Sequence, residues 1–241
     1  MKALVELQNL SISVKERPLI QDVNVTVFPE RVTALCGPSG SGKSLTARAI
    51  MGVIPSNLTL VSGSLRYPAH SEHKDWLEAA RSTNRLKELL HHTAPLRGAY
   101  FTYSPQSAAS ALNPGRTIGM QLALAISRRE QSVSDMANEI KKVLAAVELP
   151  NRAASALPSE LSGGMCQRAA LAIAVAPNPK LVIADEPETG LDPILRRSVI
   201  ELLIRVTKEF RSGLLLISHH EDSVERIADD VVRLRPLGGE L

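Results

Sequence analysis

The segment Gly37–Ser44 has residue types and a spacing suited to holding phosphate groups. Glycines allow the backbone to curl, so that successive N–H groups point inward at phosphate oxygens. Lys43 would add a positive charge near the β- and γ-phosphates, and the Ser44 hydroxyl would reach Mg²⁺. A turn that is rich in Gly and Ser by chance is the structural alternative. The predicted phosphate-binding residues are Gly37, Pro38, Ser39, Gly40, Ser41, Gly42, Lys43 and Ser44.

Two adjacent carboxylates end a hydrophobic run at residues 180–186, with the sequence KLVIADE. Asp185 is placed to hold Mg²⁺, usually through water, and Glu186 is placed to polarise an attacking water. An acidic strand end is common in isolation. Downstream of a phosphate loop, however, the pair indicates nucleotide hydrolysis. A phosphate loop alone would also fit a kinase, a GTPase or a motor protein.

A second anion-binding pattern lies at residues 161–168, with the sequence LSGGMCQR. A serine and two glycines open a predicted helix there, so its first backbone N–H groups could bind a phosphate. An ordinary N-capped helix is the structural alternative. The position of this pattern just before the Asp-Glu strand favours the functional interpretation.

The elements that must position these groups alternate between strands and helices. Apolar alternation predicts antiparallel strands at 3–7 and 23–28, and an edge strand at 63–67. The segment 68–97 is read as an insertion that carries a helix, and 150–158 as a linker. Continuous apolar runs predict strands at 32–36, 100–103, 180–184 and 214–218. Helical periodicity and caps predict helices at 45–51, 117–127, 135–147, 163–175, 194–210 and 222–228. The alternation predicts an α/β fold with a parallel sheet covered on both faces.

The composition fits a chain with a core and no stacking platform for single-stranded nucleic acid. Of 241 residues, 44% are hydrophobic and only 3% are aromatic, so no nucleic-acid partner is expected. The net charge of +3 is compatible with an anionic ligand. Two cysteines, Cys36 and Cys166, favour a reducing compartment. The N-terminus does not resemble a signal peptide, and no apolar stretch approaches the roughly 20 residues of a membrane helix. We therefore expect a soluble chain whose membrane role would require a partner.

Taken together, these motifs resemble those of the ATP-binding-cassette (ABC) ATPases over nearly the whole chain. Residues 161–165 are similar to the family signature, and Gln106 followed by SALNP at 110–114 is similar to the glutamine loop. Residues 189–192, TGLD, resemble the loop after the Asp-Glu strand. His219, which follows LLLIS, resembles the switch histidine.

The resemblance implies a P-loop NTPase (RecA-like) core with an antiparallel β subdomain and an α-helical signature subdomain. It implies a single nucleotide-binding domain over residues 1–241. The core would comprise about 1–105 and 176–241, and the helical subdomain about 107–175.

The resemblance also implies roles for individual residues. The catalytic residues would be Glu186, His219 and Gln106, and the Mg²⁺ ligands would be Ser44, Gln106 and Asp185. Leu161, Ser162, Gly163 and Gly164 would contact the ATP bound by a second subunit, and Asp192 would organise that interface. Alternatives stay open. Gln106 could be a surface-loop amide, Asp192 could be a helix N-cap beside Pro193, and His220 adjoins His219.

Several short sequence segments resemble those of the importer branch that takes up peptides, nickel and metal chelates. The resemblance is greatest to the nickel-type ATPase. The resemblance therefore implies an ATP-hydrolysing subunit bound to permease subunits at the cytoplasmic face of the plasma membrane. It implies pairing with a second ATPase chain, a heterodimer being slightly favoured over a homodimer, and indirect work with an extracytoplasmic binding protein. An exporter ATPase, or a soluble complex such as one for phosphonate degradation, is the alternative. No aromatic residue lies between Ser11 and Asp22, so ATP affinity should come mainly from the phosphates and Mg²⁺. Glu188 stands where Thr is expected, and residues 68–95 match the family least.

Overall fold

The chain forms two compact units in a computed structural model. Unit 1 contains Met1–Arg97 and Gly213–Leu241, and unit 2 contains Gly98–Ser212. The predicted boundaries of the helical subdomain, at about 107 and 175, stay a prediction. The structure describes all residues except 72–73, 79, 81–84, 107–110, 130–132, 190–192, 221–223 and 238–241, and it describes only the backbone of 193–195.

Unit 1 contains a three-stranded antiparallel sheet in the order β2-β1-β4, where β1 is Val5–Val14, β2 is Arg17–Val27 and β4 is Thr59–Arg66. Val23, Val25 and Val27 are buried along β2 while the residues between them are exposed, as alternation predicts. The predicted antiparallel strands are confirmed, although β4 begins four residues before its predicted start and β1 and β2 extend beyond their predicted ranges. They are longer because β1 and β2 form a hairpin, whose pairing continues down to Val14 and Arg17.

Unit 1 also contains three parallel strands. β3 (Val32–Cys36) pairs on one side with β7 (Gly213–Ser218) and on the other with β8 (Asp230–Arg233). Every residue of β3 and β7 is buried, which explains their continuous apolar sequences. The strand β8 was not predicted, because four residues with charged ends give no periodic signal. Among its described residues, unit 1 also contains the helices α1 (Lys43–Ile50) and α2 (Leu86–His92) and the 3₁₀ turn η3 (Ala94–Leu96).

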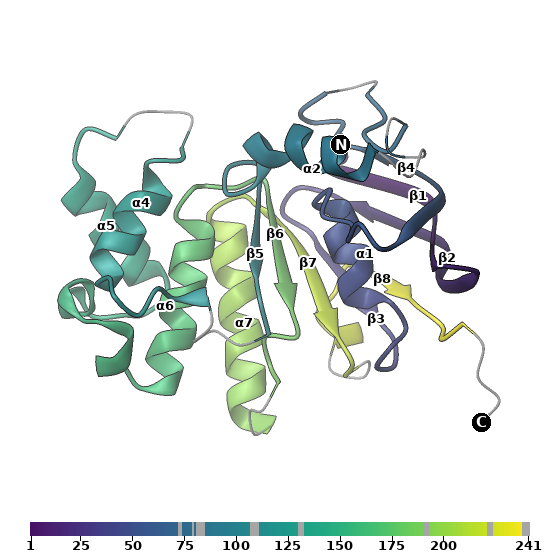
Figure 1. Ribbon diagram of the computed structural model, residues 1–241. Helices are drawn as coiled ribbons and strands as arrows, with labels where there is room; N and C mark the ends of the chain where they lie inside the picture. Colours follow the sequence, from purple (N-terminus) through teal and green to yellow (C-terminus); the bar gives the residue numbers. More distant parts are fainter. Residues whose placement is uncertain are drawn as a thin grey trace. The chain divides into compact units, whose positions relative to one another are not determined.

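The described part of unit 2 combines a pair of parallel strands, β5 (Phe101–Ser104) and β6 (Leu181–Asp185), with α-helices. The helices α4, α5 and α6 pack against one another (Figure 1). The helices are α4 (Ile118–Ile126), α5 (Met136–Ala146), α6 (Gly163–Val175) and α7 (Pro193–Glu209). The four helices predicted in this part of the chain are confirmed to within one residue at either end. The predicted linker contains the 3₁₀ turn η4 (Asn151–Ser155), and η5 (Pro158–Glu160) begins at its last residue.

Three of these helices begin where a side chain caps their first turn. The side-chain oxygens of Thr117, Asp135 and Ser162 accept hydrogen bonds from the backbone N–H three residues later, at 3.3, 3.0 and 3.4 Å. Such caps satisfy backbone donors that have no partner inside the helix. For this reason, the first residues of these helices could be predicted from the sequence.

The predicted helix at 222–228 begins in the segment 221–223, outside the described residues. The N–H groups of Ile227 and Ala228 donate to the carbonyl oxygen of Val224 at 3.0 and 2.9 Å, which are the bonds of a helical turn. Among the described residues, no helix combines the length and the apolar character that crossing a membrane requires.

Candidate functional site

The phosphate loop of unit 1 depends on glycine at two positions for steric reasons. A Cβ atom at Gly37 would lie 2.5 Å from the carbonyl oxygen of Leu234, and one at Gly42 would lie 2.9 Å from a side-chain carbon of Ile20. The φ angles of Gly40 and Gly42 are 82° and 92°, a region that side chains disfavour. The loop therefore has a backbone curvature that few other sequences could adopt.

The buried side chain of Lys43 donates hydrogen bonds to the backbone of this loop. Its ammonium Nζ donates to the carbonyl oxygens of Gly37 and Pro38 at 2.8 and 3.0 Å, and the residue is only 5% exposed. Helix α1 begins at Lys43 with no acidic residue in its first turn and no side-chain cap. A positive charge, a helix N-terminus and curled backbone donors therefore converge, which is an arrangement that binds phosphate.

His219 lies beside the start of this loop because of strand register. In the parallel pair of β3 and β7, Cys36 lies opposite Ser218, so Gly37 and His219 are the next residues at adjacent strand ends. His219 is exposed, and its ring centroid lies 4.0 Å from that of His220. Ser218 Oγ accepts a hydrogen bond from the His220 N–H at 3.0 Å. The structure thus brings a histidine to the phosphate loop, and which imidazole acts on phosphate stays a prediction.

Glu186 in unit 2 is held by two side-chain donors. Gln106 Nε2 donates to Glu186 Oε2 at 3.3 Å, and Thr189 Oγ1 donates to the same oxygen at 3.2 Å. The φ angle of Glu186 is 46°, in the left-handed region that costs energy for a residue with a side chain. Strained backbone of this kind concentrates at functional sites. The structure therefore brings Gln106 and Glu186 together, a contact that the sequence analysis did not specify, and the catalytic roles of both residues stay predictions.

Asp185, at the end of β6, is 6% exposed and accepts a hydrogen bond from the Tyr103 hydroxyl at 2.7 Å. The sequence analysis did not single out Tyr103. No sequence signal could have identified it, because the two residues lie 82 positions apart and meet only through the pairing of β5 with β6.

The start of α6 presents two exposed glycines. Among the described residues, an added Cβ atom at Gly163 or Gly164 would meet no atom within 4 Å beyond its own helix and chain neighbours, so the packing described here does not require glycine at either position. Farther along α6, Gln167 Nε2 donates to the Pro187 carbonyl oxygen at 2.6 Å, which ties this helix to the segment after Glu186. Gln106, Leu161, Gly163 and Gly164 also line one cavity of about 820 Å³ in unit 2.

The remaining predicted residues differ in exposure. In the phosphate loop, Pro38, Ser39, Gly40 and Ser44 are exposed, whereas Ser41 is buried. Asp192 lies outside the described residues. Ser162 is exposed, and Leu161 is half-buried.

Two unusual residues near these motifs also have defined environments. Glu188, which replaces an expected threonine, is fully buried at 0% exposed. Burial raises the pKa of the Cys166 thiol, whose Sγ lies 3.4 Å from the Pro158 carbonyl oxygen.

Comparisons with solved structures support the fold. The chain matches a structure described as the ATP-binding subunit of an ABC transporter with a TM-score of 0.71 at 25% identity, covering 98% of this chain and 88% of that one. It matches the dimeric bacterial ABC transporter cassette MJ0796 with a TM-score of 0.71 at 22% identity, covering 96% and 94% of the two chains. The predicted α/β P-loop NTPase fold with an antiparallel sheet is confirmed.

Sequence relatives extend the likeness. CntD of Staphylococcus aureus (strain NCTC 8325), the ATP-binding protein of a metal-staphylopine import system, is 33% identical over 226 residues, which cover 91% of this chain and 77% of CntD. OppD of Lactococcus lactis subsp. cremoris (strain SK11), an oligopeptide transport ATP-binding protein, is 33% identical over 223 residues, covering 91% of this chain and 62% of OppD. The chain thus spans about three quarters of the length of CntD and about three fifths of that of OppD. The family model for the ABC transporter matches residues 20–189. By this match and these relatives, the chain belongs to the ABC transporter family, as one of its ATP-binding ATPase subunits.

Proposed function

We propose that this chain binds and hydrolyses ATP to power an importer for a peptide, nickel or a metal chelate. The proposal that the chain hydrolyses ATP rests mainly on the side chain of Glu186. Gln106 and Thr189 orient this side chain at the end of β6. A carboxylate that accepts two hydrogen bonds in a strained segment is preorganised to receive a proton from water. The names of the relatives, a metal-staphylopine importer and oligopeptide transporters, support the importer branch.

The residues of the chain divide the work of hydrolysis. The phosphate loop and Lys43 hold the β- and γ-phosphates, Glu186 polarises the attacking water, and His219 donates a hydrogen bond to the γ-phosphate. The carboxylate of Asp185, the hydroxyl of Ser44 and the amide oxygen of Gln106 are hard oxygen donors of the kind that Mg²⁺ prefers, so the donor set fits this ion. When bound, Mg²⁺ neutralises charge that develops on the phosphate oxygens.

We propose that a second ATPase subunit completes each ATP site. A different chain is slightly favoured over another copy of this one. Gly163 and Gly164 support the presence of a second subunit, because in the part of the chain that the structure describes no atom beyond their own helix and chain neighbours lies within 4 Å of the positions where their Cβ atoms would lie. Glycine is needed where another group approaches the backbone closely, and the first N–H groups of α6 suit a phosphate. Loss of the γ-phosphate would remove a bridge between subunits, and the two would separate.

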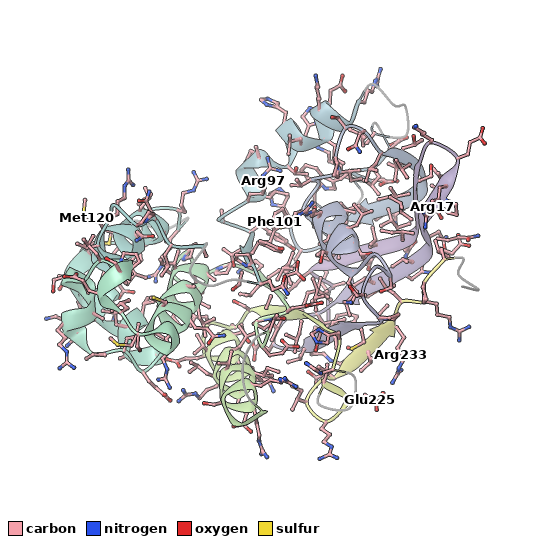
Figure 2. All side chains as sticks on the ribbon, turned by 60° about the horizontal axis from the view of Figure 1, so that its bottom comes forward. Arg17, Arg97, Phe101, Met120, Glu225 and Arg233 are labelled. Atoms are coloured by element: carbon pink, nitrogen blue, oxygen red, sulfur yellow. The ribbon has the colours of Figure 1, made fainter. Side chains whose placement is uncertain are left out.

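A surface on α4 supports a permease partner. Met120 and Leu124 are 60% and 57% exposed and lie one turn apart, so their side chains share one face of the helix. Figure 2 shows Met120 projecting outward from this helix. We propose that this face contacts a transmembrane subunit, which would hold the chain at the cytoplasmic side of the plasma membrane. The permease would receive cargo from an extracytoplasmic binding protein.

Two substitutions test the ATPase assignment. Lys43→Ala should abolish tight ATP binding, because it removes the charge at the phosphates and leaves two carbonyl groups of the loop without this donor. Glu186→Gln should retain ATP binding and lose hydrolysis by at least about 100-fold. Nucleotide affinity and phosphate release measured on the same preparations would distinguish the two. A Glu186→Gln protein that hydrolyses ATP at the parent rate would refute the role of this residue.

The importer assignment has its own test. A tagged form of the chain, expressed in the organism from which the chain comes, should co-purify from detergent extracts with integral membrane proteins and a second ATPase chain. Met120→Glu combined with Leu124→Glu should abolish this co-purification while leaving ATP binding intact. Recovery with soluble proteins only would favour a non-transport complex.

A further inference from the structure

We infer that Tyr103 is a positioning residue that fixes the carboxylate of Asp185 for Mg²⁺. This inference rests on the proposed function, in which Asp185 holds the metal of the ATP site. Its direct basis is the hydrogen bond of 2.7 Å that the Tyr103 hydroxyl donates to Asp185 Oδ2. This length is the usual one for a hydroxyl that donates to an oxygen atom.

The strand register places the two side chains together. In the parallel pair of β5 and β6, Tyr103 lies opposite Ile183, and Asp185 is two residues farther along β6. Side chains two residues apart on a strand point to the same face, so Asp185 and Ile183 share the face that Tyr103 occupies. A diagonal neighbour at this spacing lies within reach of an aromatic side chain and beyond the reach of most shorter ones.

Burial makes the contact consequential. Asp185 is 6% exposed, and a carboxylate at that depth requires hydrogen-bond donors in place of water. The hydroxyl of Tyr103 supplies one such donor without adding a charge that would repel a metal ion. It also engages Oδ2, which fixes the rotation of the carboxylate about its χ2 angle.

The expected consequence concerns the metal more than the nucleotide. Groups that hydrogen-bond a metal ligand orient it, and their loss typically weakens metal binding or activity by about 10–100-fold. Mg²⁺ retains several waters and binds weakly to protein side chains, so we expect the lower end of this range. Tyr103 is half-buried in β5, away from the phosphate loop in the sequence, and we expect no effect on metal-free nucleotide binding.

The test uses Tyr103→Phe, which removes one oxygen atom and keeps the ring. In a Glu186→Gln background, fluorescent N-methylanthraniloyl-ATP would be titrated with the full-length protein in EDTA and then over a range of Mg²⁺ concentrations. The midpoint of the Mg²⁺ dependence should rise about tenfold, and the affinity in EDTA should be unchanged. An unchanged Mg²⁺ midpoint in a folded variant would overturn the inference.

Tyr100→Phe is the matched control, because Tyr100 lies in the same segment, is 8% exposed, and precedes β5. It should leave the Mg²⁺ midpoint within twofold of the parent value. An equal shift in both variants would indicate a general loss of stability, and would also overturn the inference.

Asp185→Asn separates this inference from the proposed function on which it rests. If Asp185→Asn alone leaves the Mg²⁺ midpoint unchanged, the assignment of the metal site fails. If Asp185→Asn shifts the midpoint and Tyr103→Phe does not, only the inference fails. The two substitutions together should shift it no further than Asp185→Asn does, because the hydroxyl acts through that carboxylate. This comparison remains informative if Tyr103→Phe is less stable, since additive effects would contradict a shared role.

Discussion

Replacing Gly164 by alanine should stabilise the isolated chain and strongly reduce ATP hydrolysis in the complex that it forms with a second ATPase subunit. Gly164 is the second residue of α6, and an added Cβ atom would meet no described residue within 4 Å apart from its own helix and chain neighbours. Alanine is favoured over glycine by up to about 1 kcal/mol inside a helix, and we expect about half of this in the first turn. For a chain of this size, the melting temperature should rise by about 1–2 °C.

Gly119 provides a matched control, because it is also the second residue of a helix with a hydroxyl cap. The caps are Thr117 for α4 and Ser162 for α6. A Cβ atom at Gly119 would lie 2.8 Å from the Ala154 carbonyl oxygen, so something must shift. Overpacking of this kind costs about 1–3 kcal/mol, and Gly119→Ala should lower the melting temperature by several degrees.

Gly164→Ala, which should be the more stable of the two variants, should be the less active one. If a phosphate of a second subunit's ATP lies against the first turn of α6, the methyl group of Gly164→Ala would displace it. Loss of such backbone donors costs about 100–1000-fold in rate. Gly119→Ala should retain most of its activity at temperatures where it is folded. Differential scanning calorimetry of the isolated variants would test the stabilities, and phosphate release from each variant assembled with its second ATPase subunit would test the activities. A Gly164→Ala protein that supports full ATPase activity would refute the proposed contact between α6 and the ATP of a second subunit. A variant destabilised like Gly119→Ala would refute the steric reasoning.

Two further predictions concern acid–base chemistry. Hydrogen bonds from Arg205 and then Arg168 lower the pKa of Glu148 below its ordinary value of 4.5. The ion pairs therefore stabilise the fold above pH 4.5, and this contribution is lost as the pH falls through the lower folded value. Glu148→Gln should reduce the free energy of unfolding by about 1 kcal/mol or less at pH 7, since the carboxylate is half exposed, and this deficit should shrink in urea titrations below pH 4.5. Because burial raises the pKa of Cys166 above 9.0, iodoacetamide should alkylate it more slowly at pH 7 than it alkylates free cysteine, and faster as the pH rises past 9. Mass spectrometry would measure the alkylation, with the fully buried Cys36 as the internal reference. Equal alkylation rates for Cys166 and free cysteine at pH 7 would contradict that expectation.

Local rules made most of the elements predictable. The helix at 163–175 could be bounded because Ser162 caps it and Pro177 and Pro179 follow it, and these signals act within a few residues. The strand at 32–36 was readable because burial on both faces demands a continuous apolar run. By contrast, β8 has only four residues and depends on β3 for its pairing, so its own sequence does not specify it.

The amino-acid sequence by itself determined the chemistry of the motifs, because the types and spacing of residues such as Gly37 and Lys43 limit the ligands that a short segment can hold. Only the tertiary structure decided which groups meet. The contacts of Glu186 with Gln106 and of Asp185 with Tyr103 each join residues at least 80 positions apart. The physical reason is that a parallel strand pair places its carboxyl ends together through register, which depends on backbone hydrogen bonds and not on local sequence.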